Sequence, residues 1–319
     1  MSIALVVLAV SALAGQSLSH DDKVRVGEFY RLADAVQEKV WSGWSRVPAP
    51  VLLVTADKEY LFRNSVIPAG FTKQEDGTYA RARQFPTTLL ATFPAFGQPA
   101  VIVVGEPKAT EVKTSSDWLL TMMHEHFHQL QYAQPGYYEA VTALGLSHGD
   151  QSGMWILNYP FPYERADLNG AFETAKAALL RATSEQDGAR WKQAAIDYKK
   201  ARAAFFALLS PEQARYLEFQ LWQEGIARYT EISVSRAALE FKPSDEFARL
   251  RDYTALADLF KGREDETLNE LRKASLKDWQ RVVVYSWGAT EGMLLDRLDP
   301  EWKKNYFQHP LTMQHYWSH

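Results

Sequence analysis

The distribution of strand-forming segments is the feature that most constrains how this chain can fold. Short runs rich in β-branched and aromatic residues lie between Pro50 and Glu106, where Gly and Pro residues separate them as turns. After Thr114 such runs nearly vanish, and helical patterns with polar links take over. The sequence therefore predicts an α+β protein with a small sheet followed by a helical region. The expected strands are 51–55, 60–63, 78–81, 87–93 and 100–104.

The N-terminal segment has the pattern of a signal peptide. Residues 3–14 form an almost unbroken apolar run that ends in the small residues Ala12 and Ala14, as at an A-x-A cleavage site. The run is shorter than the ~20 residues of a membrane-spanning helix. We therefore expect export to the periplasm or the exterior, with cleavage after Ala14 or a few residues later. A buried N-terminal helix is the alternative.

Three parts of one unit are expected along the chain. They are the signal peptide at 1–19, a subdomain with one helix and the sheet at 20–114, and a helical subdomain at 115–319. The first helix is expected over 24–41. Ser210-Pro211-Glu212-Gln213 marks a helix start, because it combines an N-cap Ser, a Pro at N1 and a Gln at N3. Residues 150–169 form the longest expected loop.

Composition excludes several partners and kinds of site. The chain has 35 Lys+Arg against 39 Asp+Glu and no basic run, so nucleic acid is not an expected partner. No apolar segment of about 20 residues follows position 20, so no membrane span is expected after signal cleavage. The chain has no cysteine, and any metal ion would therefore be held by His and carboxylate side chains.

One predicted helix, 118–132, carries the strongest chemical motif. Ser115-Ser116-Asp117 cap its start, and the helix contains His124-Glu125-His126-Phe127-His128. His124 and His128 fall about 40° apart on a helix, so both imidazoles can reach one ion, and Glu125 can hold a water bound to it. His126 points about 200° away from His124 and is not expected to be a ligand. The alternative is a helix whose histidines are satisfied by polar neighbours.

This H-E-x-x-H motif resembles that of the zinc peptidases called zincins. The resemblance implies Zn²⁺ held by both histidines and a third protein ligand, with one position open for water. The metzincin pattern would need Gly and His where this chain has Gln131 and Gln134. The short thermolysin-like spacing would need Glu where the chain has Ser147 and His148. His148 stays open as a third ligand.

Residues 221–231 resemble the ligand helix of aminopeptidase-type gluzincins, W-x-x-E-G-x-A-x-Y-x-E, which implies Glu224 as the third ligand. Glu224 lies 96 positions after His128, since 224 − 128 = 96, and this long spacing implies inserted helices over 171–210. The alternative for Glu224 is a surface pair with Arg228.

Two neighbours of Glu224 carry further predictions. Gly225 in mid-helix costs about 1 kcal/mol relative to Ala, which predicts a close approach of two helices there. Glu231 is a candidate to orient a ligand imidazole, and a solvated carboxylate is its alternative.

Two more segments fit the same resemblance. Tyr285-Ser286-Trp287-Gly288-Ala289 resembles the Y-x-K-G-A segment of these aminopeptidases, which implies that Tyr285 donates a hydrogen bond to the oxyanion, although Trp287 replaces the Lys. An ordinary core Tyr on a tightly packed helix is the alternative. Residues 92–97 and 100–105 precede the motif helix as the edge and inner strands of zincins do. There the edge strand pairs with an extended peptide, whereas a protected edge is the alternative here.

The resemblance implies an exported zinc-dependent metallopeptidase of gluzincin type that acts on a peptide or protein substrate. Its zincin-like fold would place Zn²⁺ on His124, His128 and Glu224, with a metal-bound water activated by Glu125 and the oxyanion assisted by Tyr285. The helical subdomain 115–319 would then be the catalytic one. Two classes stay open: a zinc-dependent hydrolase of a non-peptide amide or ester, and a non-catalytic exported zinc-binding protein. Glu106 is a weaker candidate for binding a substrate amine.

Overall fold

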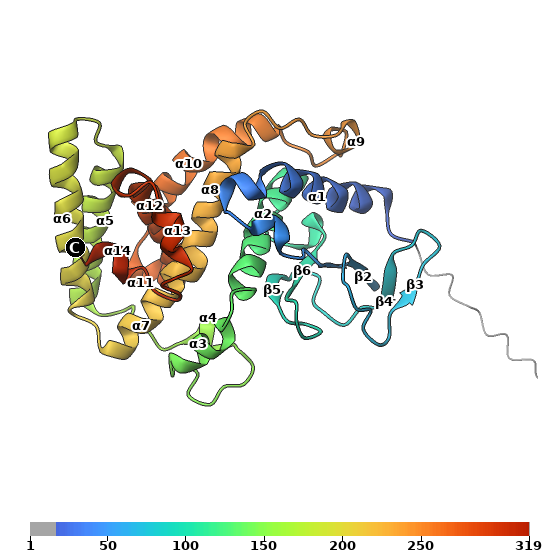
Figure 1. Cartoon of the computed structure of the whole chain (residues 1–319), viewed down its shortest axis with the longest axis horizontal. Coiled ribbons are helices and arrows are strands. Elements are labelled where there is room, and N and C mark those ends of the chain that lie inside the picture. The colour runs from blue at the N-terminus through green and yellow to red at the C-terminus, as the bar shows by residue number, and fades with distance from the viewer. Residues whose placement is uncertain (1–16, 319) are drawn as a thin grey trace, which may run out of the picture.

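The computed structural model describes residues 17–318 and confirms an α+β fold (Figure 1). A six-stranded sheet lies at one end of the molecule, and helices build the rest. The strands are β1 (Val51–Val54), β2 (Lys58–Phe62), β3 (Thr72–Lys73), β4 (Tyr79–Ala82), β5 (Leu90–Phe93) and β6 (Val101–Gly105).

The helices begin with α1, before the sheet, and continue with α2 after it. They are α1 (His20–Val40), α2 (Ser115–Tyr132), α3 (Tyr137–Ala143), α4 (Trp155–Asn158), α5 (Ala166–Ser184), α6 (Gly188–Phe206), α7 (Pro211–Gln220), α8 (Ile226–Ala237), α9 (Asp245–Ala248), α10 (Leu256–Lys273), α11 (Leu276–Trp279), α12 (Val283–Leu298), α13 (Trp302–Tyr306) and α14 (Gln314–Trp317). Short 3₁₀ turns are η1 (Trp44–Arg46), η2 (Pro107–Ala109) and η4 (Gln280–Val282), and η3 (Leu221–Gly225) is a π-helical turn. Within the described part of the chain, no helix has both the length and the apolar character needed to cross a bilayer.

Most of the predicted signal peptide lies outside the described residues. Of positions 1–19, only the last three are described. Leu18 is buried, and the Ser19 hydroxyl accepts a hydrogen bond from the backbone N–H of Asp22 at the start of α1. These two residues therefore belong to the packed part of the molecule.

The sheet has the strand order β3-β4-β2-β1-β6-β5. The neighbouring strands β1 and β6 are parallel, and every other pair is antiparallel. Strand side chains alternate between two cores. Leu53 and Ile102 join the main core beneath α1 and α2, whereas Leu52 and Val103 pack under the loops on the opposite face. β5 forms one edge of the sheet, as the sequence predicts.

Two segments differ from the sequence-based expectation. Residues 72–73 form the two-residue strand β3, which is exposed and pairs only with β4. The expected loop 150–169 contains the single turn α4 and gives way to α5 at Ala166. Both differences involve elements with little apolar periodicity, so tertiary contacts decide them.

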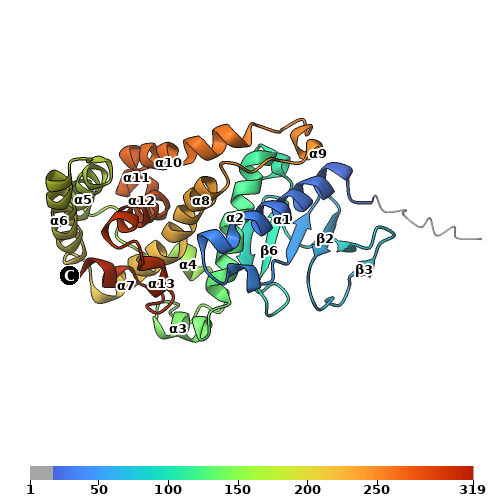
Figure 2. The same ribbon diagram turned by 45° about the horizontal axis from the view of Figure 1, so that its top comes forward.

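The motif helix α2 lies where the sheet meets the helical part, and both views show it flanked by α1 and α8 (Figures 1 and 2). Helices α5 and α6 form a hairpin at the far end of the molecule, which begins five residues before the predicted inserted region 171–210 and covers most of it. The predicted capping box at Ser210 starts α7, with both of its reciprocal hydrogen bonds present. Part of the interval between the motif and Glu224 is thus taken up by a hairpin that lies away from α2.

Candidate metal centre

Helix α2 brings its histidines into the interior of the protein. Its N-cap is Thr114, one residue before the expected Ser115-Ser116-Asp117 cap, because the Thr114 hydroxyl accepts from the N–H of Asp117. Ser115 and Ser116 are instead bound to the segment before α10. The side chains of the H-E-x-x-H motif are buried around the whole circumference of the helix.

Two imidazoles and two carboxylates converge at this point. The Nε2 atoms of His124 and His128 lie 3.1 Å apart. The Glu224 Oε2 atom lies 3.5 Å from the first and 3.4 Å from the second. One possible ligand atom from each of His124, Glu125 and His128 lies within 4.8 Å of the other two. These three buried residues could therefore hold a metal ion.

Carboxylate Glu231 sets the orientation of His124. Its Oε1 atom lies 2.7 Å from the His124 Nδ1 atom, which donates a hydrogen bond to it, so Nε2 is the ring atom that faces His128 and Glu224. Arg228 and Arg263 both form ion pairs with the other Glu231 oxygen. Glu231 thus makes the contact with His124 that its predicted orienting role requires. Arg228 pairs with Glu231, and not with Glu224 as the alternative for Glu224 had it.

A neutral amide performs the same task for His128. The Gln131 Oε1 atom lies 2.7 Å from the His128 Nδ1 atom. Its amide nitrogen faces three acceptors, the backbone carbonyls of Trp222 and Gln223 and the hydroxyl of Tyr306. The amide oxygen must therefore be the atom that faces His128. Nδ1 of His128 therefore also carries the proton, and its Nε2 lone pair also faces Glu224.

This arrangement calls for positive charge between the facing atoms. Burial alone would raise the pKa of the Glu224 carboxyl, but His128 and His124 hold that pKa well below its usual range. Burial alone would lower the pKa of His124, but its hydrogen bonds to Glu224 and Glu231 raise it to about 10. Two lone pairs and a carboxylate oxygen so close together are stabilised only by a shared cation, either a proton or a metal ion.

The spacing of the three facing atoms fits a metal ion. Nitrogen and oxygen ligands about 2.0–2.2 Å from a tetrahedral ion lie roughly 3.3–3.6 Å from one another. Two of the observed separations, 3.4 and 3.5 Å, lie in this range, and the third, 3.1 Å, is slightly shorter. The donor set is also one that the imidazole-binding transition metals accept.

Comparison with known proteins gave no match to a family model, to a curated protein or to a solved structure.

The backbone around Glu224 is held by a close helix crossing. Glu224 lies in the π-helical turn η3, a local widening of the helix that is frequent at functional sites. A Cβ atom added to the next residue, Gly225, would lie 2.6 Å from the Cα atom of Gly288 on α12. The close approach predicted from Gly225 is confirmed, and it positions Glu224 against α2.

Sheet edge β5 contacts the motif directly through Thr92. Its hydroxyl lies 2.8 Å from the Glu125 Oε2 atom and 2.9 Å from the Glu125 backbone carbonyl. Sequence reasoning assigned no role to Thr92, which acts through a tertiary contact, or to Gln131, which lies three residues after His128 on the same helix. The only available indication was position: Thr92 lies in the segment expected to precede the motif as an edge strand.

Tyr285 lies beside the histidines. Its half-buried ring is 6.1 Å from that of His124, centre to centre, and nearly parallel to it. The guanidinium groups of Arg228 and Arg281 lie 5.9 and 5.5 Å from the Tyr285 ring centre. Burial and the nearby Glu224 charge raise the pKa of Tyr285, so its hydroxyl stays protonated and able to donate.

Other candidate residues lie elsewhere. His126 contacts Gln37 and Gln129, on the side predicted to face away from the metal, and burial lowers its pKa to about 4. His148 is exposed and its ring contacts Glu212. Glu106 forms an ion pair with Lys108 and has no contact with the histidine group.

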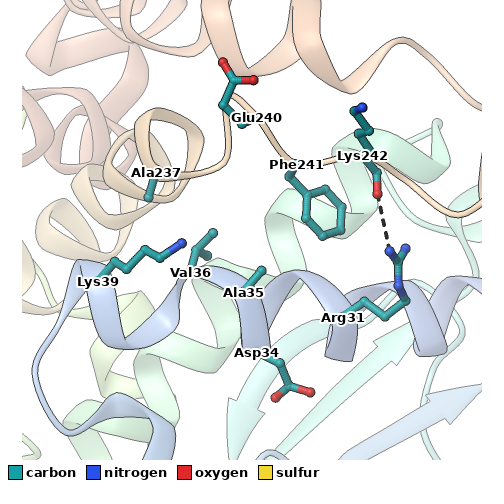
Figure 3. A pocket seen from close by; sticks show the side chains of 9 residues that line it. All are labelled: Arg31, Asp34, Ala35, Val36, Lys39, Ala237, Glu240, Phe241 and Lys242. Atoms are coloured by element: carbon teal, nitrogen blue, oxygen red, sulfur yellow. Dashed lines mark hydrogen bonds between the residues drawn. The ribbon is translucent and has the colours of Figure 1, made fainter.

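Two surface grooves lie apart from these histidines. The larger, of about 610 Å³, runs between α1 and the residues after α8, where Arg31 donates to the Lys242 carbonyl (Figure 3). The smaller, of about 340 Å³, adjoins it through Lys39. Neither groove is lined by a residue of the metal centre, and the charges around the larger are of both signs.

Proposed function

We propose that this protein is an exported zinc-dependent metallopeptidase of gluzincin type with a zincin-like arrangement of sheet edge and motif helix. The observation that carries the proposal is the triangle of the two Nε2 atoms and the Glu224 Oε2 atom, with the Glu125 carboxylate beside it. The buried histidine pair, its two orienting partners and the converging carboxylate support a metal site built for function rather than a hydrogen-bonded helix core.

Zn²⁺ suits the donor set, and His124, His128 and Glu224 would hold it. A zinc ion bound there would act as a Lewis acid towards the scissile carbonyl and the attacking water. Glu231 and Gln131 hold the two imidazoles with their Nε2 atoms facing inward. The burial of all three ligand side chains limits competition from bulk water.

The remaining residues supply proton transfer and alignment. Glu125 would accept the proton of the attacking water and deliver it to the leaving nitrogen. Thr92 donates a hydrogen bond that fixes the orientation of this carboxylate. Tyr285 would donate to the developing oxyanion. Among residues 17–318, no strand pairs with the outer side of edge strand β5, which lies next to Glu125; this supports its pairing with an extended peptide.

The assignment of the base is tested by Glu125→Gln. The variant should bind zinc as the wild type does and lose hydrolysis of a peptide library, because the amide cannot accept the proton. Bound metal is measured by elemental analysis and cleavage by mass spectrometry. Full activity in this variant would overturn the role of Glu125.

The third ligand is tested by Glu224→Ala beside His148→Ala. The first should lower zinc occupancy sharply, and the second should leave occupancy unchanged because His148 is exposed and occupied with Glu212. The opposite pattern would move the ligand to His148.

Substrate class and export are tested on the unmodified protein. Cleavage of casein or peptides, abolished by a chelator and restored by zinc, supports a peptidase. Activity on esters or non-peptide amides alone indicates a different hydrolase, and bound zinc without turnover indicates a binding protein. The apolar run at 3–14 supports export, which predicts a periplasmic or secreted protein that lacks the run when its mass is measured.

A further inference from the structure

One arginine near the metal centre lacks the partner that comparable arginines have. Within residues 17–318, seven arginines are buried or half-buried, and six of them have a carboxylate oxygen within 4.0 Å. Arg281 is the exception. The six paired arginines are Arg25, Arg81, Arg165, Arg202, Arg228 and Arg263.

The contacts that Arg281 does make are long. Its Nη1 atom lies 3.4 Å from the Tyr285 hydroxyl and 3.5 Å from the Gln220 Oε1 atom, at the outer limit of hydrogen bonding. A guanidinium has five N–H donors in a fork that matches a carboxylate, so most of its binding capacity is unused here. Leaving a partly desolvated cation without an anion costs free energy.

The position of Arg281 links this unused capacity to the site. It occupies the turn η4 just before α12, one helical turn from Tyr285, whose ring stacks beside His124. Gln220 lies one turn before Glu224. Glu224, which faces the histidines, is the carboxylate whose charge acts on Arg281, together with the phenolic groups of Tyr285 and Tyr216. The guanidinium thus borders the metal centre on the α7–α12 side.

We propose that Arg281 binds a carboxylate of the substrate, and so selects peptides that carry a negative charge near the scissile bond. The carboxylate has two possible sources, the C-terminus of a short peptide or the side chain of an Asp or Glu residue. The inference rests on the proposed peptidase function and adds the substrate class. A bidentate Arg–carboxylate contact would give the guanidinium the partner that the folded chain does not provide.

Hydrolysis of matched peptides tests the inference. The set contains an N-acetylated peptide with a free C-terminal carboxylate, the same peptide as its C-terminal amide, and the amide with one internal Glu. We expect the wild type to cleave at least one carboxylate-bearing peptide roughly 10- to 100-fold more efficiently, by kcat/KM, than the uncharged amide, since hydrogen bonds to charged groups are worth about 1.5–3 kcal/mol. Which peptide gains identifies the source of the carboxylate.

Variants of Arg281 separate recognition from a structural role. Arg281→Gln should remove the preference while keeping cleavage of the uncharged amide, and Arg281→Lys should restore part of the preference through its charge. Arg249→Gln is the control, because Arg249 is highly exposed. Equal loss on charged and uncharged peptides would overturn the inference, as would an unchanged preference in Arg281→Gln.

A binding measurement keeps this test apart from that of the peptidase function. Calorimetric titration of zinc-loaded protein with the acetylated peptide acid and with its amide needs no turnover. If the wild type cleaves no peptide yet binds the acid more tightly, and Arg281→Gln abolishes the difference, the proposed function fails and carboxylate recognition stands. Equal binding of acid and amide by the wild type, with no preference in hydrolysis, overturns the role of Arg281.

Discussion

The two metal-facing imidazoles are held by partners of different charge. His124 donates to the carboxylate Glu231, and His128 donates to the neutral amide of Gln131. A carboxylate partner makes an imidazole a more basic ligand. Arg228 and Arg263 form ion pairs with the same Glu231 carboxylate, and their positive charges weaken that effect. The site therefore gains orientation from both partners without adding the full charge of another buried anion.

Thr92→Val tests the alignment of Glu125. The substitution keeps the shape of the side chain and removes the hydroxyl that contacts the Glu125 carboxylate. We expect kcat to fall roughly 10- to 100-fold with little change in KM, because a hydrogen bond to a charged group is worth about 1.5–3 kcal/mol. Steady-state kinetics measures both constants. Thr72→Val, on exposed strand β3, is the control, and a wild-type kcat in Thr92→Val would contradict the role.

For single residues, the sequence predicts the directions of side chains that lie on the same helix. The side on which His124 and His128 face, and the opposite direction of His126, follow from helical geometry alone, and the structure agrees. Thr92 and Arg281 gain their importance from contacts between segments distant in the chain, and the Gln131 amide is oriented by the distant carbonyls of Trp222 and Gln223. Such contacts leave no periodic pattern in the sequence, and only the fold reveals them.

Among the elements, the crossing of η3 with α12 determines where Glu224 lies. Gly225 and Gly288 meet backbone to backbone, whereas Gly292 lies against the side chain of Tyr229. Glycine has a low helix propensity, but at these positions it lets the helices approach more closely than any side chain would allow. The π-helical turn beside them places Glu224 and the carbonyls that bind Gln131 on the side facing α2.

Gly225→Ala and Gly288→Ala should therefore destabilise the protein. Each added methyl group would lie 2.6 Å from the backbone of the other helix, which cannot yield without separating the helices. We expect a loss of about 1–3 kcal/mol in the free energy of unfolding, measured by urea denaturation. Gly225→Ala should also weaken zinc binding through the shift of Glu224.

Gly262→Ala is the matched control for this pair. Gly262 lies within α10 and has open space where its Cβ would be, so the substitution should stabilise the helix by about 0.5–1 kcal/mol. Equal effects at Gly225 and Gly262 would show that the crossing is not tight in solution.

Elements with local determinants were predictable. The Ser210 capping box and the strands at β1 and β6 follow from neighbouring residues. β3 and α4 were not expected, because each is too short for a recognisable period and depends on its partners. The long interval between His128 and Glu224 led to the prediction of inserted helices over 171–210, and the α5–α6 hairpin occupies most of these positions.

For the molecule as a whole, a buried ionic network attaches the α5–α6 hairpin to the rest. Arg202 on α6 forms ion pairs with Glu218 on α7 and Glu291 on α12, and Tyr198 donates to Glu291. Burial raises the pKa of Glu291 even though Arg202 opposes this effect. The network connects the consecutive helices α6 and α7 to the distant helix α12.

Arg202→Met should leave two buried carboxylates without their cation. Removing one partner of such a pair costs about 3–5 kcal/mol, so we expect a loss of that order in the free energy of unfolding. Urea denaturation of zinc-free protein measures the loss without a contribution from metal binding. Arg181→Met, in an exposed pair with Asp197, should cost less than about 1 kcal/mol, and equal losses in the two variants would contradict the importance of burial.

Helix α2 is fastened to every part of the molecule that surrounds it. Gln129 donates to the carbonyls of Pro50 and Ala100 beside the sheet, His126 contacts Gln37 on α1, and His124 contacts Glu231 on α8. Neither the sheet nor the helical part can separate from α2 without breaking some of these contacts. The amide protons of α2 should therefore exchange with solvent deuterium only when the entire protein unfolds, and the metal site should be among the last structures to disappear on denaturation.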